Sequence, residues 1–160
     1  MLDEPSTAPS VIRLATPDDL EIINQLDQLS TSPLRNIPRD IEKYFGSVDP
    51  TTHERTLIFL SIMDGEVVGK AELMLPPQSD HGEGWQGAVG YIKRVIVHSE
   101  FRQLGLARGL MKHIIEFAHT ELQLSALDLH VWEMNLPAIR LYESLGFEVQ
   151  HRELYFRLPL

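Results

Sequence analysis

The stretch Val95–Leu110, V-I-V-H-S-E-F-R-Q-L-G-L-A-R-G-L, decides the fold, because its pattern changes from strand to helix within a few residues. The β-branched run that opens it is typical of a buried strand, and apolar residues recur at helical spacing from Ala107 to Ala118. The turn between the two, residues 102–107, contains a glycine and leads into helical N–H groups that have no acceptor within the helix. Such a turn favours a bound phosphate, with a tight connection as the alternative.

The rest of the chain alternates strand and helix patterns around this stretch. Asp64-Gly65 lies between two apolar runs and predicts a hairpin turn, while Pro17 and Pro137 suit the first positions of helices. The predicted strands are 11–15, 56–63, 67–75, 88–97, 127–131, 147–150 and 154–158. The predicted helices are 17–29, 41–45, the stretch from the turn at 102–107 to about residue 120, and 137–145. This order predicts a mixed α/β domain with an antiparallel front half and crossover helices.

The length and composition predict one globular domain. The chain has 160 residues, of which 43% are hydrophobic and 23% charged, and no apolar run approaches the roughly 20 residues of a membrane span. We expect a single domain over residues 11–160. Residues 1–10 are polar and lack the basic start and apolar centre of a secretory signal, so we expect a flexible tail.

The charge balance and the absence of cysteine narrow the possible partners. Fourteen basic residues stand against 23 acidic ones, a net charge of -9, which argues against nucleic-acid or anionic-membrane binding and mildly favours a cationic acceptor. The sequence has no cysteine, which excludes disulfides and thiolate chemistry and makes a cytoplasmic location the default expectation. The seven histidines lack metal-ligand spacing, so we expect no catalytic metal.

A second constellation follows about thirty residues after the turn, as one run over residues 129–147, L-H-V-W-E-M-N-L-P-A-I-R-L-Y-E-S-L-G-F. Together with the R-x-x-G-x-A turn, it resembles the L-x-V-x-x-x-N-x-x-A-I-x-L-Y-x-x-x-G-F segment of the GCN5-related N-acetyltransferase (GNAT) superfamily. The resemblance implies a mixed, mostly antiparallel sheet of about seven strands, splayed at the acetyl-CoA site and flanked by about four helices. It also implies acetyl-CoA as cosubstrate.

The resemblance implies how coenzyme A would be held. The pyrophosphate would lie on the main-chain N–H groups of the turn, and the pantetheine arm would pair with the backbone of Ile96 and Val97 and contact Asn135. The implied coenzyme A residues are Ile96, Val97, Arg102, Gln103, Leu104, Gly105, Leu106, Ala107, Arg108, Asn135 and Tyr142. The same resemblance implies that the strand ending at Val97 and the strand before Asn135 splay apart, and that the acetyl thioester enters the gap between them. The Val97 N–H would then face the thioester oxygen.

The resemblance also suggests the acid and the base. Tyr142 would protonate the departing thiolate, for which a phenol is suited. Many relatives carry a glutamate as base where this chain has Tyr91, whereas in relatives that acetylate protein N-termini the base corresponds to His130. An imidazole can take a proton from an ammonium directly or through water, but an outward-facing strand histidine is the alternative. The other candidates for the base are Glu72, Glu83, Glu133 and a water chain.

The function implied is transfer of acetyl from acetyl-CoA to a primary amine, on a small molecule or a peptide N-terminus, by direct attack through a tetrahedral intermediate. A non-catalytic acyl-CoA-binding module that regulates a partner is the alternative, and a longer acyl group is a third reading. Trp85 and Trp132 are candidates for lining the acceptor pocket, with core packing as the alternative. Relatives often dimerise, so a homodimer is a further expectation, and the sequence does not identify the amine.

Overall fold

The computed structural model describes residues 10–29, 45–78 and 84–160 of the chain. The predicted helix at 41–45 and the predicted tail at 1–10 lie almost wholly outside these ranges. Contacts divide the chain into two compact units, Met1–His130 and Val131–Leu160, and each is considered by itself. That the two form one domain stays a prediction. Within the described ranges, no helix combines the length and the apolar character needed to cross a bilayer.

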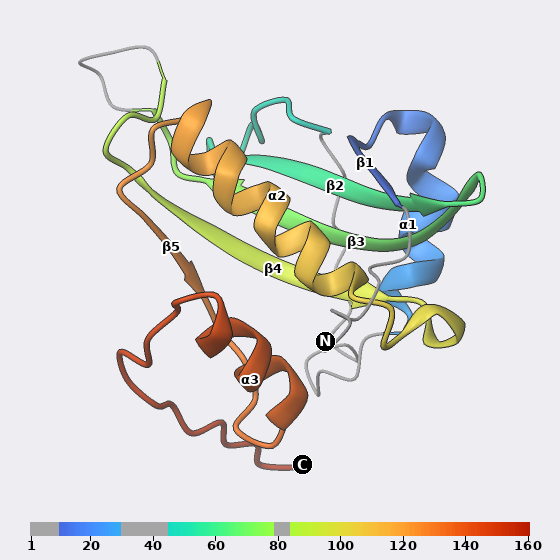
Figure 1. The fold of residues 1–160 in the computed structure, drawn as a ribbon. Coiled ribbons are helices and arrows are strands. Elements are labelled where there is room, and N and C mark those ends of the chain that lie inside the picture. The colour runs from blue at the N-terminus through green and yellow to red at the C-terminus, as the bar shows by residue number, and fades with distance from the viewer. Residues whose placement is uncertain (1–9, 30–44, 79–83) are drawn as a thin grey trace, which may run out of the picture. The chain divides into compact units, whose positions relative to one another are not determined.

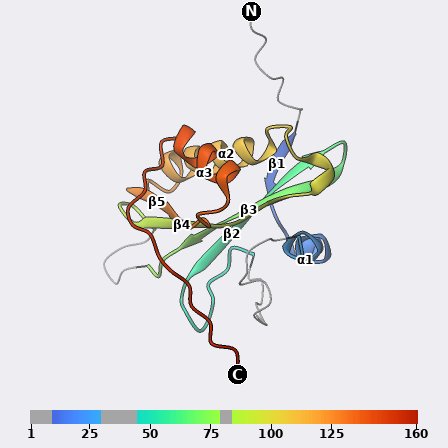
Figure 2. The ribbon, with the colours of Figure 1, turned by 90° about the horizontal axis from the view of Figure 1, so that it is seen from below.

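The first unit is one five-stranded sheet with helices on both faces (Figures 1 and 2). The strands lie in the order β1 (Val11–Leu14), β2 (Arg55–Met63), β3 (Glu66–Leu75), β4 (Val89–Val97) and β5 (Ala126–Leu129). The first four pair antiparallel, and β5 pairs parallel to β4 after a crossover through a helix. This topology confirms the mixed, mostly antiparallel sheet, with fewer strands than the seven expected.

The hairpin and the helices arise where the sequence predicts them. Asp64 (φ 51°) and Gly65 (φ 79°) both adopt left-handed conformations, the geometry of a tight hairpin turn between β2 and β3. The first helical segment is a short 3-10 turn, η1 (Pro17–Asp19), that continues as α1 (Leu20–Asp27). The helix after the opening stretch is α2 (Leu106–Thr120), preceded by a second 3-10 turn, η3 (Ser99–Phe101).

The two faces of the sheet bury different helices, as Figure 2 shows. On one face, Ile23 of α1 packs with Ile58 and Leu60 of β2, and all three are almost fully buried. On the other face, Phe59 of β2 meets Phe117 of α2 edge to face, with the ring centroids 5.4 Å apart. Because strand side chains alternate between faces, consecutive residues of β2 supply the two cores.

The second unit contains α3 (Leu136–Ser144), which begins with Pro137 in its first turn and is followed by Gly146 with φ 99°. The predicted closing strands at 147–150 and 154–158 are wrong for the described structure, which has no strand in these ranges. Alternating apolar residues form a strand only where another strand accepts their backbone hydrogen bonds, and the pattern alone does not supply that partner.

An ion pair between Arg13 and Asp19 fixes the start of α1. Asp19 accepts two hydrogen bonds from the Arg13 guanidinium, at 2.8 and 2.9 Å, and a third from the Thr16 N–H at 2.8 Å. These bonds, chiefly the one with Arg13, lower the pKa of the Asp19 carboxyl from 3.8 to about 2. The ion pair therefore stabilises the fold above pH 3.8, and its contribution is lost as the pH falls through about 2.

We expect Asp19→Asn to lower the free energy of unfolding by on the order of 1 kcal/mol at pH 7, since Arg13 is partly exposed and water screens the pair. Urea unfolding of the wild type and the variant from pH 7 to pH 2 measures this difference. It should shrink as the pH falls from about 4 to about 2, because the Asp19 carboxyl is protonated first in the unfolded chain and only near pH 2 in the folded one. A difference that stays constant down to pH 2 would contradict this assignment.

Candidate active site

The turn between β4 and α2 has a backbone built for an anion. After η3 the chain passes through Gln103 (φ 65°) and Gly105 (φ 76°), both in the left-handed region, and Gly105 is the N-cap of α2. Left-handed residues between right-handed or extended ones turn successive N–H groups toward one concave surface. The N-terminal end of the α2 dipole adds positive potential at the same place. The turn predicted from the sequence is thus present, with left-handed residues at positions 103 and 105 directly before the N-terminus of α2.

Side chains support the turn from outside. The His98 ring accepts a hydrogen bond from the Glu100 N–H at 3.2 Å, which caps η3. The Arg102 Nε donates to the Val97 carbonyl over 3.3 Å, so this arginine ties the turn back to the end of β4. In this arrangement the backbone offers the anion its directional donors, and Arg102 first serves to shape the turn.

The edge of β4 that faces β5 is paired over only part of its length. The parallel pairing joins Val89–Ile92 to Ala126–Leu129, and β4 then continues to Val97 beyond the end of β5. The His98 N–H donates to the Val68 carbonyl over 2.7 Å. Because backbone groups alternate along an antiparallel ladder, the Val97 N–H and carbonyl point away from β3, toward the side that β5 has left. Beside the turn, the Val97 N–H of β4 is thus directed to the side where the pairing with β5 has ended.

Tyr91, in the part of β4 that pairs with β5, lies beside His130, which directly follows β5. The Tyr91 hydroxyl and the His130 Nδ1 are 2.5 Å apart, and the two ring centroids are 5.4 Å apart. Parallel pairing places Tyr91 opposite Asp128, so His130 comes just beyond it on the same face. The sequence singled out both positions separately, Tyr91 as a departure from the usual glutamate and His130 as a base, but it did not predict their contact.

The other candidates for the base are placed differently. Glu72 is 2% exposed and forms an ion pair with Lys70, so its carboxylate is already engaged inside the fold. Glu133 belongs to the second unit, where its carboxylate lies 3.9 Å from the Arg152 guanidinium on the surface. Glu83 lies outside the described residues. Of these glutamates, the two that the structure describes are thus each held in an ion pair.

The second unit carries the remaining predicted residues. The Asn135 side chain accepts a hydrogen bond from the Ala138 N–H at 3.4 Å and caps α3, a role compatible with contact to a ligand. Tyr142 lies on α3 with its ring edge to face with Phe147, at 6.0 Å between centroids. Burial raises the pKa of the Tyr142 phenol above its ordinary value of 10.0, so the phenol keeps its proton at neutral pH.

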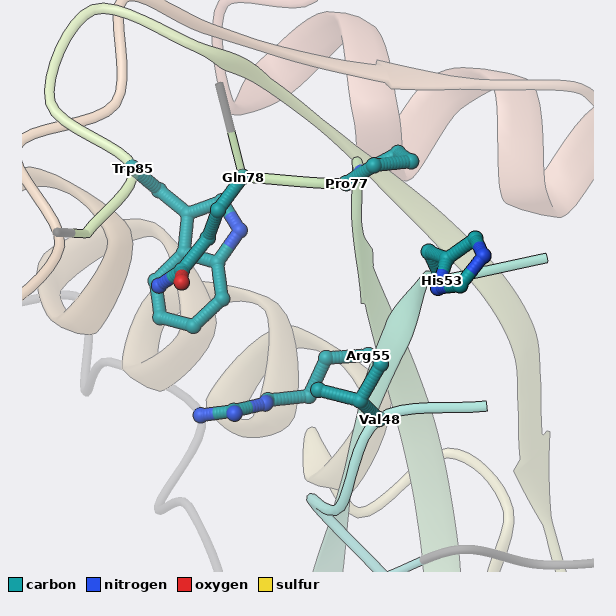
Figure 3. A pocket seen from close by; sticks show the side chains of 6 residues that line it. All are labelled: Val48, His53, Arg55, Pro77, Gln78 and Trp85. Atoms are coloured by element: carbon teal, nitrogen blue, oxygen red, sulfur yellow. The ribbon is translucent and has the colours of Figure 1, made fainter. Parts of the chain in front are cut away.

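A hollow of about 470 Å³ lies at the other end of the sheet (Figure 3). It is lined by Val48, His53, Arg55, Pro77, Gln78 and Trp85. The Arg55 guanidinium lies 4.9 Å from the centroid of the Trp85 ring, and the indole N–H donates to the Pro76 carbonyl at 2.9 Å. Since β2 begins and β3 ends here, this hollow is separated from the β4–α2 turn by the length of the strands. Trp85 therefore contributes to a pocket, but away from the turn.

Sequence reasoning missed a group of buried charges below α1. Lys70 is fully buried and contacts both Asp27 and Glu72, with Arg94 beside them. A signal was present in the sequence, because Lys70 and Glu72 are two residues apart in a strand of mostly apolar residues and must share one face. Their partners on α1 and β4 could not be identified from spacing.

The comparisons with known proteins identify the family and several relatives of the chain. The chain matches the profile of the Acetyltransferase (GNAT) family over residues 20–147. It is 30% identical over 138 residues to glucosamine 6-phosphate N-acetyltransferase of Trypanosoma brucei brucei, with 84% of each chain covered. It is 32% identical over 92 residues to the N-terminal acetyltransferase B catalytic subunit NAA20 of Arabidopsis thaliana, covering 58% of this chain and 47% of that one.

A solved structure shares the fold. The enzyme AAC(6')-Iy, in complex with the bisubstrate analog CoA-S-monomethyl-acetylneamine, superposes with a TM-score of 0.65 at 19% identity. The superposition covers 96% of this chain and all of the other. At this identity the likeness concerns the arrangement of helices and strands, which it confirms.

The left-handed glycine of the turn offers a direct test of the anion site. An alanine at φ near 76° costs roughly 1–2 kcal/mol, so Gly105→Ala should distort the turn and weaken binding of coenzyme A about tenfold by calorimetric titration. Gly65→Ala is the matched control, because Gly65 has φ 79°, no atom within 4 Å of an added Cβ, and a position in the hairpin turn between β2 and β3. If Gly105→Ala and Gly65→Ala bind coenzyme A with equal affinity, a backbone site at residues 103–108 is contradicted.

Proposed function

The chain belongs to the acetyltransferase (GNAT) family, and on that premise we propose that it transfers acetyl from acetyl-CoA to a primary amine of a small molecule or a peptide N-terminus. Family membership makes the chain an acetyl-CoA-dependent acyltransferase. Beyond family membership, the proposal names the class of acceptor and the residues that act on it. It is supported by the site geometry within each unit and by the names of the relatives, which acetylate a sugar phosphate amine or protein N-termini.

The observation that carries the proposal is the unpaired edge of β4 next to the β4–α2 turn. The N–H groups of residues 103–108 would hold the pyrophosphate, and the Val97 backbone would pair with the pantetheine arm along the edge that β5 leaves open, whereas the Ile96 backbone faces Lys70 of β3. An N–H that points from Val97 into this opening is a fixed donor for the oxygen of the thioester. The residues present thus fit coenzyme A, with Asn135 and Tyr142 proposed to contact it from the second unit.

The proposed reaction needs a proton removed and a proton supplied. The attacking amine must lose a proton, which His130 would accept directly or through water, while Tyr91 holds the imidazole by its hydroxyl. The amine nitrogen then bonds to the acetyl carbon, and the carbon–sulfur bond breaks. Tyr142 would give its proton to the sulfur that leaves, which suits a phenol whose pKa is raised by burial.

A screen of amines tests the proposed activity. We expect thiol release from acetyl-CoA with at least one class among amino acids, polyamines, amino sugars and short peptides. Tyr142→Phe should lower kcat about 10²-fold with little change in KM for acetyl-CoA, because it removes a proton and little else. If none of the tested amines causes thiol release although acetyl-CoA binds tightly, the result would instead support the non-catalytic module. An unchanged kcat in Tyr142→Phe would overturn the assignment of the acid.

The pair of Tyr91 and His130 predicts a specific change in pH dependence. We expect His130→Ala to lower kcat/KM by 10-fold or more and to remove the acidic limb of its pH profile, because that limb reports protonation of the base. Tyr91→Phe should lower kcat/KM less than His130→Ala does, since the imidazole remains and loses only its hydroxyl partner. His151→Ala, which alters an exposed histidine paired with Glu153, is the control and should retain the limb. An intact limb in His130→Ala would contradict its role.

A further inference from the structure

Four buried or half-buried charges meet beneath α1. The Lys70 ammonium lies 2.5 Å from Asp27 at the C-terminal end of α1 and is hydrogen-bonded to Glu72 on its own strand. The Arg94 guanidinium of β4 lies 3.6 Å from the other Asp27 oxygen and 4.0 Å from Glu72. Two cations thus face two carboxylates, and the four come from α1, β3 and β4. We name Asp27, Lys70, Glu72 and Arg94 the charge cluster.

The charge cluster surrounds a β-bulge. The pairing of β3 with β4 runs through Lys70 opposite Ile96 and Glu72 opposite Lys93, so two residues of β4 lie against one of β3 between these pairs. Arg94 is one of the two, and its φ of 53° is left-handed without a glycine. The residues of β3 on either side of the bulge are therefore the two that bind charges from α1 and from the bulge itself.

The bulge decides which way the end of β4 faces. One extra residue reverses the side-chain alternation of everything after it. With the bulge, Ile96 shares the face of Lys70, while Val97 lies opposite Gly69, where an added Cβ would meet both Val97 and Leu110 of α2. The same shift sets which N–H groups point away from β3, and those include the N–H of Val97. Without the bulge, β4 beyond it would shift by one residue against β3, and that shift would turn the Val97 N–H back toward β3.

The charge cluster resists such a move. A fully buried ammonium needs both carboxylates, because losing one leaves a charge without compensation in a site that water does not reach. A shift of β4 would carry the Arg94 guanidinium away from Asp27 and Glu72 and leave those carboxylates in excess. Buried ion groups of this kind contribute more to a single conformation than to net stability.

We propose that the charge cluster is a lock that holds the β4 bulge in register, with Arg94 as a positioning residue for the Val97 N–H at the acetyl group. The proposal rests on the acetyl transfer proposed above. Arg94 itself does not touch the reacting atoms in this scheme. It acts through the backbone, so losing it should lower the rate of the chemical step more than the binding of coenzyme A.

The experiment compares Arg94→Met with Arg94→Lys and with a control that also loses an ion pair. We expect Arg94→Met to lower kcat at least 10-fold while KM for acetyl-CoA changes less than threefold, and Arg94→Lys to recover part of kcat. Arg13→Met breaks the ion pair to Asp19 at the start of α1, far from β4, and should leave kcat unchanged. An unchanged kcat in Arg94→Met, or an equal loss in Arg13→Met, would overturn the lock.

Amide hydrogen exchange gives a readout that does not depend on activity. The His98 N–H is bonded to Val68 only in the bulged register, so its exchange should accelerate at least 10-fold in Arg94→Met and remain slow in Arg13→Met. If the wild type acetylates no amine, the proposed function fails while this exchange still tests the lock. If the wild type is active and His98 exchange is the same in Arg94→Met, the lock is wrong and the function stands.

Discussion

The structure depends on a single constraint at β4, which must pair with β3 to its end while leaving its other edge open after Ile92. A strand with one open edge in the middle of a fold is costly, because its backbone groups have no partners within the sheet. This edge lies beside the turn that leads into the N-terminus of α2, where the first helical N–H groups have no acceptor within the helix. A ligand with an extended polar arm and a phosphate head is the natural partner for both.

The rest of the first unit keeps that edge in place. Apolar residues of α1 and α2 cover opposite faces of the sheet, so the strands cannot shift without exposing one core or the other. The bulge at Arg94 interrupts the regular pairing of β3 with β4, and the charged side chains of Asp27, Lys70 and Glu72 lie around it. Packing thus fixes the sheet, and charge pairing fixes the bulge in β4.

The sequence predicted most of the local structure that the described residues show, and its site residues stay predictions. The Asp64-Gly65 turn and the α2 pattern after Gly105 depend on residues close together in the chain, and the structure confirms them. The closing strands at 147–150 and 154–158 were wrong, because an alternating pattern does not say which strand will pair with it. The contact of Tyr91 with His130 joins residues far apart in the chain, so spacing could not show it.

By itself the sequence determined the family and the turn between β4 and α2, and it supplied the candidates for the acid and the base, because these reside in short patterns with a local physical meaning. Only the tertiary structure decided the register of β4, the partner of His130 and the burial of Lys70 between Asp27 and Glu72. Each of these depends on which distant segments pack together. The position of a one-residue bulge cannot be identified from the alternation of side chains alone, because a bulge is defined by the pairing register with the neighbouring strand.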